Sequence, residues 1–323
     1  LLKIFTLIFD FGGLILLNLS LRHFKIKIIN PLFLFLNIGY FYNTLFWGQV
    51  DAIHSFFIFL SAFLILKEKP TFAVLAFILA LNFKLQSIVF APVLLILLLP
   101  FIYKLPKLIL KILFSALIFQ FVIFAPFIFT NKLGDIISVA TSQVGFFPYL
   151  SLQAFNTWYL ISGPGARWLT DNVTYLGITA RNIGFIAFAL SSIVALTPSV
   201  KVIKEMIKEK TSTFTKSDFA SICLTVGLLF FNFFFFNTQM HERYIHPAML
   251  FIFAYAFIEK KPIIYIALSL IYFLNLEKVL MILPIDHLNN PFLSSRIIAG
   301  MYAMIMAYLY YSHIGKLIFR KKN

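Results

Sequence analysis

Residues 224–258, "LTVGLLFFNFFFFNTQMHERYIHPAMLFIFAYAFI", place a short polar segment between two strongly apolar runs. With its flanking residues, each run approaches the roughly 20 residues that a helix needs to cross a ~30 Å hydrocarbon core. Charged side chains at the edge of hydrocarbon are costly, so such a segment is usually retained for a task. The stretch therefore predicts two membrane helices joined by a turn with a functional role.

The composition of the whole chain supports this class of fold. Of the 323 residues, 61% are hydrophobic and 12% are charged, and the mean hydropathy is +0.93, which is far from the composition of soluble domains. The alternating ten-residue segments of a membrane barrel are absent. We expect a single all-α domain, residues 1–323, which is a polytopic integral membrane protein with about eleven transmembrane helices. The predicted spans are 4–20, 28–44, 53–67, 71–84, 87–103, 109–129, 183–199, 219–236, 246–258, 263–283 and 295–314.

The formal net charge of +15 is distributed unevenly. Most basic residues fall in one alternating set of loops, "RHFKIK", "KEKP", "KLPK", "KVIKEMIKEK", "EKKP" and the tail "GKLIFRKKN". The positive-inside rule makes this set cytoplasmic, with some attraction to anionic membrane lipids. The charge is thus a topology signal, and no nucleic-acid partner is predicted. The bias toward Phe, Ile, Lys and Asn is typical of an AT-rich microbial genome, which favours a bacterial plasma membrane.

The other set of loops contains nearly all the unusual polar residues, so a functional site is expected on the non-cytoplasmic side. The longest of these stretches, residues 131–182, mixes apolar residues with Ser, Gln and Asn. That mixture is typical of helices that lie in the interface plane. Within this stretch, Asn156 either caps an interfacial helix or contacts substrate.

The segment "WGQVD" contributes Trp47, Gln49 and Asp51. One interpretation is an aromatic-belt turn with a solvated carboxylate. The other is that Gln49 and Asp51 hydrogen-bond a polar substrate beside the indole ring.

The segment "NFKLQS" places Lys84 at the outer end of a helix, where the positive-inside rule disfavours lysine. Its ammonium group either snorkels to headgroups or binds a lipid phosphate as a point charge. Gln86 is a further candidate for substrate contact.

The segment "HERY" is the most informative about the function, because its residue types suit contacts with a phosphate and a sugar. Arg243 offers a planar fork of donors that matches phosphate, His241 shares protons near neutral pH, and Tyr244 is suited to stacking on a sugar. A structural ion pair between Glu242 and Arg243 is the alternative. A zinc site from His241, Glu242 and His246 lacks the HExxH spacing, so no cofactor is predicted, and a divalent metal is left open.

In chain order, "LLKIFTLIFDFGGLILL", "NTLFWGQVDAIHSFFIFLSAFLI", "LALNFKLQSIVFAPVLLI", "SLQAFNTWYLISG" and "MHERYIHPAMLF" resemble membrane glycosyltransferases of the GT-C class. The chain is most similar to bacterial proteins related to the GPI-anchor second mannosyltransferase. More distantly, it resembles the dolichyl-phosphate-glucose-dependent glucosyltransferases. The resemblance extends from Leu1 to about residue 260.

The resemblance implies transfer of a hexose, most simply mannose, from a polyprenyl-phosphate carrier to a lipid, glycan or protein acceptor, with inversion. Such proteins carry the catalytic carboxylate in the first outer loop, and this chain begins where their second span begins. The base is therefore expected upstream of Leu1, with Asp51 and Glu242 as substitutes. Inversion needs a base opposite a departing phosphate and groups that stabilise the phosphate charge. Lys84, His241 and Arg243 suit the latter role.

Two other functions are compatible with the same residues. A flippase or transporter of lipid-linked sugars would also recognise lipid phosphate, but it predicts polar groups at mid-membrane depth and inverted repeats. No convincing internal repeat is present. A non-catalytic membrane subunit that supports another enzyme is the third hypothesis.

Overall fold

The computed structural model describes residues 1–27, 37–142, 145–287 and 289–319, most of which are helical. Seven helical segments among them are long and apolar enough to cross a membrane: α1 (Leu2–His23), η1 (Leu85–Phe90) continued by α6 (Ala91–Lys104), α7 (Leu108–Phe129), α10 (Ala180–Lys208), α11 (Lys216–Phe236), α13 (Pro262–Leu280) and α14 (Ser295–Phe319). Three shorter helices are also apolar: α4 (Asp51–Leu66), α5 (Pro70–Phe83) and α12 (His246–Ile258). The remaining elements are α3 (Ile38–Leu45), α8 (Leu133–Ser142), α9 (Thr157–Ser162), η2 (Gly163–Arg167), η3 (Pro291–Leu293) and the hairpin β1 (Thr174–Tyr175) and β2 (Ile178–Thr179). The protein is therefore an all-helical integral membrane protein.

The helix ends follow local sequence signals. Thr215 and Asp218 form a capping box that starts α11. The turns "KEKP" and "EKKP" both place proline in the first turn of the next helix, where its missing N–H costs nothing. The predicted span 246–258 coincides with α12, whereas the predicted span 183–199 is longer in the structure, where α10 covers Ala180–Lys208.

The number of spans differs from the expectation. Part of the predicted span 28–44 lies outside the described residues, and the described part holds only the eight-residue α3. Helices α4, α5 and α12 are apolar but shorter than a full crossing. Seven full-length candidates are thus present in the described ranges, and a total of eleven stays a prediction.

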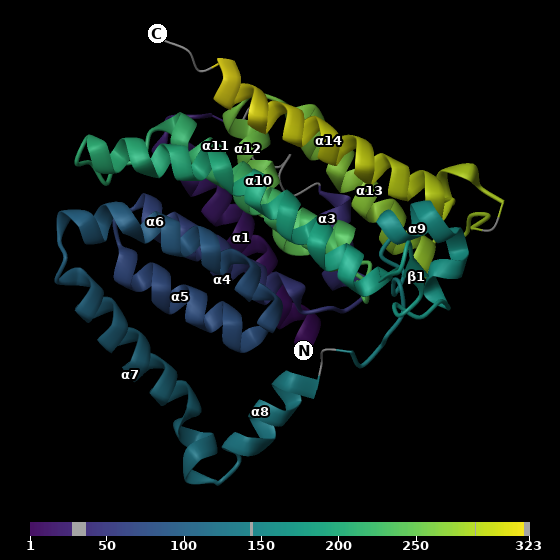
Figure 1. Ribbon diagram of the computed structural model, residues 1–323, viewed down its shortest axis with the longest axis horizontal. Coiled ribbons are helices and arrows are strands. Elements are labelled where there is room, and N and C mark those ends of the chain that lie inside the picture. The colour runs from purple at the N-terminus through teal and green to yellow at the C-terminus, as the bar shows by residue number, and fades with distance from the viewer. Residues whose placement is uncertain (28–36, 143–144, 288, 320–323) are drawn as a thin grey trace.

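Helices α11 and α12 form the centre of the bundle (Figure 1), where they pack on each other and on α1, α4, α10, α13 and α14. Gly227 makes the central contact possible, because a Cβ there would lie 2.6 Å from Ile252. Helix α7 is the opposite case. Ile112 is its one buried residue, and Figure 1 shows α7 and α8 extending away from the other helices. An apolar helix exposed in this way is suited to contact with lipid.

The outer segment 131–182 contains more than interfacial helices. Helix α8 is mostly exposed, with Leu133 and Ile136 half-buried, as an interfacial helix would be. Helix α9 instead packs on the bundle, where Trp158 is buried and its indole N–H donates to the Phe236 carbonyl over 3.0 Å. The hairpin was not predicted. Its turn residues Leu176 and Gly177 both have positive φ, and Gly177 is the signal that sequence reasoning missed.

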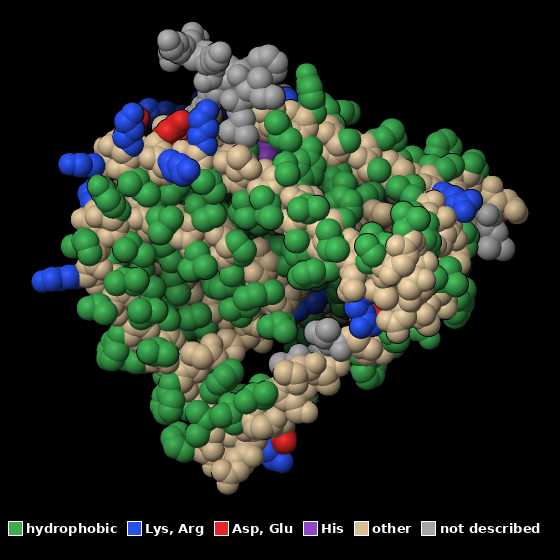
Figure 2. Space-filling model, viewed as in Figure 1, with side chains coloured by type: hydrophobic (Ala, Val, Ile, Leu, Met, Phe, Trp, Pro, Cys, Tyr) green, Lys and Arg blue, Asp and Glu red, His purple; other side chains and the backbone are tan. Residues whose placement is uncertain are grey.

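The loops gather at two ends of the bundle. At one end, Lys67 contacts His23 over 3.0 Å and Thr213 donates to Glu68 over 2.9 Å, so the basic loops lie together. Figure 2 shows most of the visible Lys and Arg side chains at this end of the molecule. The other end joins the α11–α12 loop to the start of α4 and the end of α5.

Candidate functional site

Three chain segments meet at the second end. Asp51 is the first residue of α4, Lys84 follows the last residue of α5, and residues 237–245 connect α11 to α12. The connecting loop turns at Gln239, whose φ is 62°, and it pairs with the outer segment through a hydrogen bond from the Leu152 N–H to the Met240 carbonyl. The two sequence motifs "WGQVD" and "HERY" are therefore neighbours in space.

Asp51 is the most heavily engaged side chain. Its carboxylate accepts a hydrogen bond from the Lys84 ammonium group and one of 3.3 Å from the Asn43 amide. The Arg243 guanidinium lies 3.5 Å away and the His54 ring 3.8 Å away. The side chain is 3% exposed. Asp51 is thus a buried counter-charge, and the interpretation as a solvated carboxylate is wrong.

Glu242 holds a matching position on the other side of Arg243. Its carboxylate accepts hydrogen bonds from the Trp47 indole over 2.7 Å and from Arg243 over 3.1 Å, and His241 lies 3.7 Å away. Burial raises the pKa of the carboxyl, but the hydrogen bond with His241 and the charge of Arg243 outweigh it, so the pKa lies below its usual value. The ion pair of Glu242 with Arg243, which the sequence left as the alternative, is present, and phosphate recognition by Arg243 stays a prediction.

Exposure separates the acids from the bases. The carboxylate side chains of Asp51 and Glu242 are 3% and 2% exposed, whereas those of Lys84, Arg243 and His241 are 25%, 18% and 25% exposed. The two carboxylates, Asp51 and Glu242, balance the charges of Lys84 and Arg243, so these four side chains together are neutral. The accessible side of the cluster is nevertheless basic, which is the arrangement that attracts an anion.

Tyr244 and Gln86 hold the cluster in place. The Lys84 ammonium group lies 4.2 Å from the centre of the Tyr244 ring, a cation–π contact. The Gln86 amide donates to the Tyr244 carbonyl over 2.8 Å. Both predicted residues therefore lie at the site, and Gln86 fixes the backbone of the "HERY" loop.

The two remaining predicted residues, Gln49 and Asn156, differ in their contacts. Gln49 is half-buried beside Trp47, and its side chain donates to none of the described residues. Asn156 accepts from the Trp158 N–H over 3.1 Å and donates to the Phe234 carbonyl over 3.1 Å, so the capping interpretation is confirmed. A substrate contact by Asn156 stays a prediction.

Asp171 was not singled out from sequence, yet it ties the outer segment to the loop. Its carboxylate accepts from Arg181 over 2.8 and 2.9 Å, from Thr238 over 3.1 Å and from Gln239 over 2.6 Å. Burial raises its pKa, but these hydrogen bonds lower it to a net value below the usual one. Arg181 carried the signal, since it is a basic residue beside a loop that the sequence predicts to be non-cytoplasmic.

A groove runs from the site to the exposed helices. It has a volume of about 950 Å³ and is lined by Lys84 together with apolar side chains such as Ile88, Phe124, Phe127 and Val139 from η1, α7 and α8. Figure 2 shows Lys or Arg side chains within a hollow between the α4–α6 helices and the α9 region. The surface near the site thus combines an apolar groove with a basic end.

A second polar layer lies beneath the cluster. The ring of His246 stacks on Tyr40 at 4.5 Å, and its Nε2 atom lies 3.8 Å from the Asp10 carboxylate. His54 contacts the Ser87 hydroxyl over 3.2 Å. His246 therefore faces the bundle interior and not His241. Among the described residues, no three His, Cys, Asp or Glu side chains gather closely enough to hold a metal ion.

Comparison with known proteins gives no further assignment. No family model matches the chain, and no curated protein or solved structure is significantly similar to it.

Proposed function

We propose that the protein is a hexosyltransferase of the GT-C type. In this proposal it moves a hexose, with inversion, from a polyprenyl-phosphate carrier to a lipid, glycan or protein acceptor on the non-cytoplasmic face. The observation that supports it most is the orientation of the charges. Lys84 and Arg243 have buried carboxylates behind them and keep an accessible side. This arrangement suits the phosphate of a lipid-linked donor at the membrane surface.

The apolar groove beside Lys84 supports the same donor class. A polyprenyl chain needs an apolar path that ends at the phosphate site. The groove has Lys84 and several apolar side chains in its lining, together with the polar side chains of Asn82, Gln120, Thr130, Lys132 and Asp135. Its α7 wall is exposed along the bundle exterior, so a lipid is able to enter from the bilayer. The sugar would then lie near Trp47, Gln49 and Tyr244.

Asp51 and Glu242 act in this proposal as counter-charges. A catalytic base must reach the acceptor hydroxyl, and both carboxylates are almost completely buried and already accept hydrogen bonds. The role of Asp51 and Glu242 is to orient Lys84 and Arg243. This agrees with the resemblance, which assigns the base to a first outer loop.

The experiment is transfer from radiolabelled polyprenyl-phosphate mannose in membranes that contain the full-length protein and a membrane-extract acceptor. Arg243→Lys is expected to reduce kcat/KM at limiting donor, because an ammonium group does not reproduce the fork of the guanidinium. The loss should be about 1.5–3 kcal/mol of transition-state stabilisation. Arg167→Lys is the matched control, since Arg167 is exposed and lies over Trp168, away from the acids. Unchanged kinetics at limiting donor in Arg243→Lys would refute the assignment.

A transporter of lipid-linked sugars is the second candidate, and the polar layer of Asp10, Tyr40 and His246 favours it. A transporter would move the labelled lipid between leaflets of proteoliposomes without changing its chemistry. Formation of a new mannosylated product favours the transferase, and translocation of intact donor favours the transporter.

A further inference from the structure

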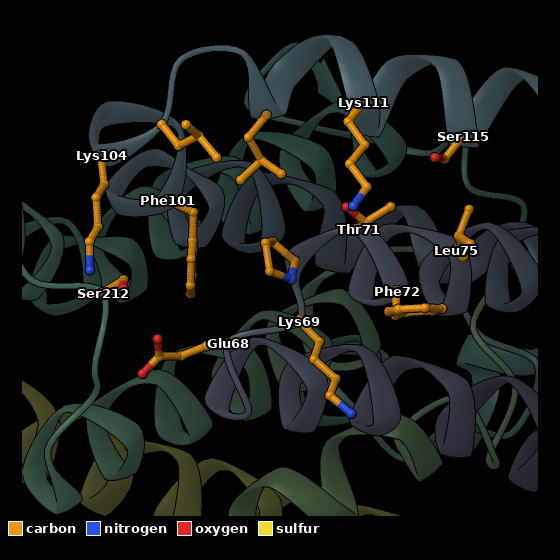
Figure 3. A pocket seen from close by; sticks show the side chains of 13 residues that line it. Glu68, Lys69, Thr71, Phe72, Leu75, Phe101, Lys104, Lys111, Ser115 and Ser212 are labelled. Carbon is orange, nitrogen blue, oxygen red and sulfur yellow. The ribbon is translucent and has the colours of Figure 1, made fainter.

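A second basic cavity lies at the opposite end of the molecule from the candidate site. Its volume is about 780 Å³, and it is formed where the start of α5 faces the turn between α6 and α7. Three lysines line it, Lys69, Lys104 and Lys111. Figure 3 shows Lys104 extending toward Ser212 and Lys111 toward Thr71. The cavity belongs to the end that carries the basic loops.

The basic groups of this cavity are not neutralised by protein. Within the described ranges, the ammonium groups of Lys69, Lys104 and Lys111 donate no hydrogen bond and form no ion pair. The one carboxylate in the lining, Glu68, already accepts from the Thr213 hydroxyl over 2.9 Å. This differs from the candidate site, where each cation has a buried acid behind it. The cavity thus presents unbalanced positive charge.

Apart from the hydroxyls of Thr71, Ser115 and Ser212, the remaining walls are mostly apolar and lead to an exposed apolar surface. Phe72, Leu75 and Leu108 line the cavity beside the lysines. Helix α7 continues from this point with an exposed apolar face, on which Leu110 is 67% and Leu117 is 70% exposed. A molecule bound here meets ammonium groups at one end and the hydrocarbon region at the other.

We infer that this cavity binds the headgroup of an anionic phospholipid. The headgroup lies in the cavity with Lys104 and Ser212 on one side of it and Lys111 and Thr71 on the other, and the acyl chains lie along the exposed face of α7. Clusters of basic residues between membrane helices recognise anionic headgroups through charge and hydrogen bonds. A free phosphate ion shares the headgroup chemistry but would gain nothing from the apolar wall. The inference does not depend on the proposed transferase activity.

The test is a titration of the purified full chain, in neutral detergent, with dioctanoyl phosphatidylglycerol, followed by native mass spectrometry. The double variant Lys104→Gln/Lys111→Gln is expected to weaken binding about tenfold, because the ammonium groups on both sides of the headgroup are lost. The control Lys204→Gln/Lys208→Gln removes the same charge from exposed positions of α10 at the same end, and its affinity should change by less than about twofold.

Two further titrations identify the source of the phosphate. Dioctanoyl phosphatidylcholine should bind more weakly than phosphatidylglycerol, and the double variant should remove the difference. Inorganic phosphate in large excess should not compete. Equal loss of affinity in both double variants would overturn the site, because charge alone would then explain binding. Competition by inorganic phosphate as effective as that of the lipid would overturn the lipid assignment.

Discussion

At the scale of residues, the decisive feature is that two carboxylates lie behind two cations. Asp51 contacts Lys84 and Arg243, and Glu242 contacts Arg243 and Trp47. Breaking a buried pair by removing one partner leaves an uncompensated charge, which costs more than the pair itself contributes. The cluster therefore has to be kept whole, and its acids are as important for anion recognition as its bases.

This charge balance predicts the effect of Asp51→Asn on stability. The amide keeps the shape but leaves Lys84 and Arg243 with one counter-charge, so the free energy of unfolding should fall by about 3 kcal/mol, the low end of the range for a broken buried pair. A lower thermal midpoint in detergent would show it. Asp135→Asn is the control: its pair with Lys132 is 69% and 65% exposed, so a change within about 0.5 kcal/mol is expected. Equal midpoints for the two variants would contradict the charge balance.

Sequence reasoning reached the site residues but not their pairing. Lys84 was identified because a lysine on the non-cytoplasmic side is unusual, and Arg243 because its motif interrupts apolar sequence. The partner of Lys84 lies 33 residues away in sequence, and Trp47 and Glu242 are separated by 195 residues. Such contacts are set by tertiary packing, which no local pattern reports. The same reason explains why the sequence leaves a solvated carboxylate as one of two interpretations of Asp51.

At the scale of elements, the outer segment positions the "HERY" loop through one carboxylate. Asp171 joins the start of α10 to Thr238 and Gln239, so its hydrogen bonds connect the segment to the loop. The sequence predicted interfacial helices here because it mixes apolar and polar residues. That pattern does not distinguish a helix in the interface from one such as α9, which is covered by the bundle.

The lowered pKa of Asp171 predicts a pH dependence. Its folded-state pKa lies below the unfolded value of about 3.9, so its contribution to stability is present above that pH and is lost as the pH falls through the folded pKa. The thermal midpoint of the wild type should therefore fall as the pH is lowered below about 4, and that of Asp171→Asn should fall less over the same range. Parallel curves for the two proteins would show that Asp171 does not carry this dependence.

At the scale of the whole molecule, the apolar helices lie between two ends. One end carries the basic loops and the other carries the candidate site. Hydropathy predicted most of the helices, because every long apolar run must satisfy its backbone internally in a membrane. It does not distinguish a full crossing from a helix such as α12, which is short but buried. Burial inside a bundle and burial in lipid select the same side chains, so sequence alone does not separate them.

The separation of the two ends predicts opposite accessibility. Cysteines placed at the exposed residues Asn172 and Lys208 should react with an impermeant thiol reagent from opposite sides of a sealed membrane. The native Cys223 is buried and provides little background. Reaction of both positions from the same side would exclude this arrangement of the helices.

The central claim is that Lys84 and Arg243 recognise a lipid phosphate, and the most direct measurement compares polyprenyl monophosphate with uncharged polyprenol. Binding of each to the purified protein is measured by native mass spectrometry, for wild type, Lys84→Gln and the control Lys3→Gln, whose ammonium group contacts only the Leu45 carbonyl among the described residues. We expect wild type and Lys3→Gln to bind the phosphate about tenfold or more tightly than the alcohol, because one charged hydrogen bond contributes roughly 1.5 kcal/mol or more. Lys84→Gln should lose most of this preference. Equal binding of both lipids by wild type, or an undiminished preference in Lys84→Gln, would contradict the account.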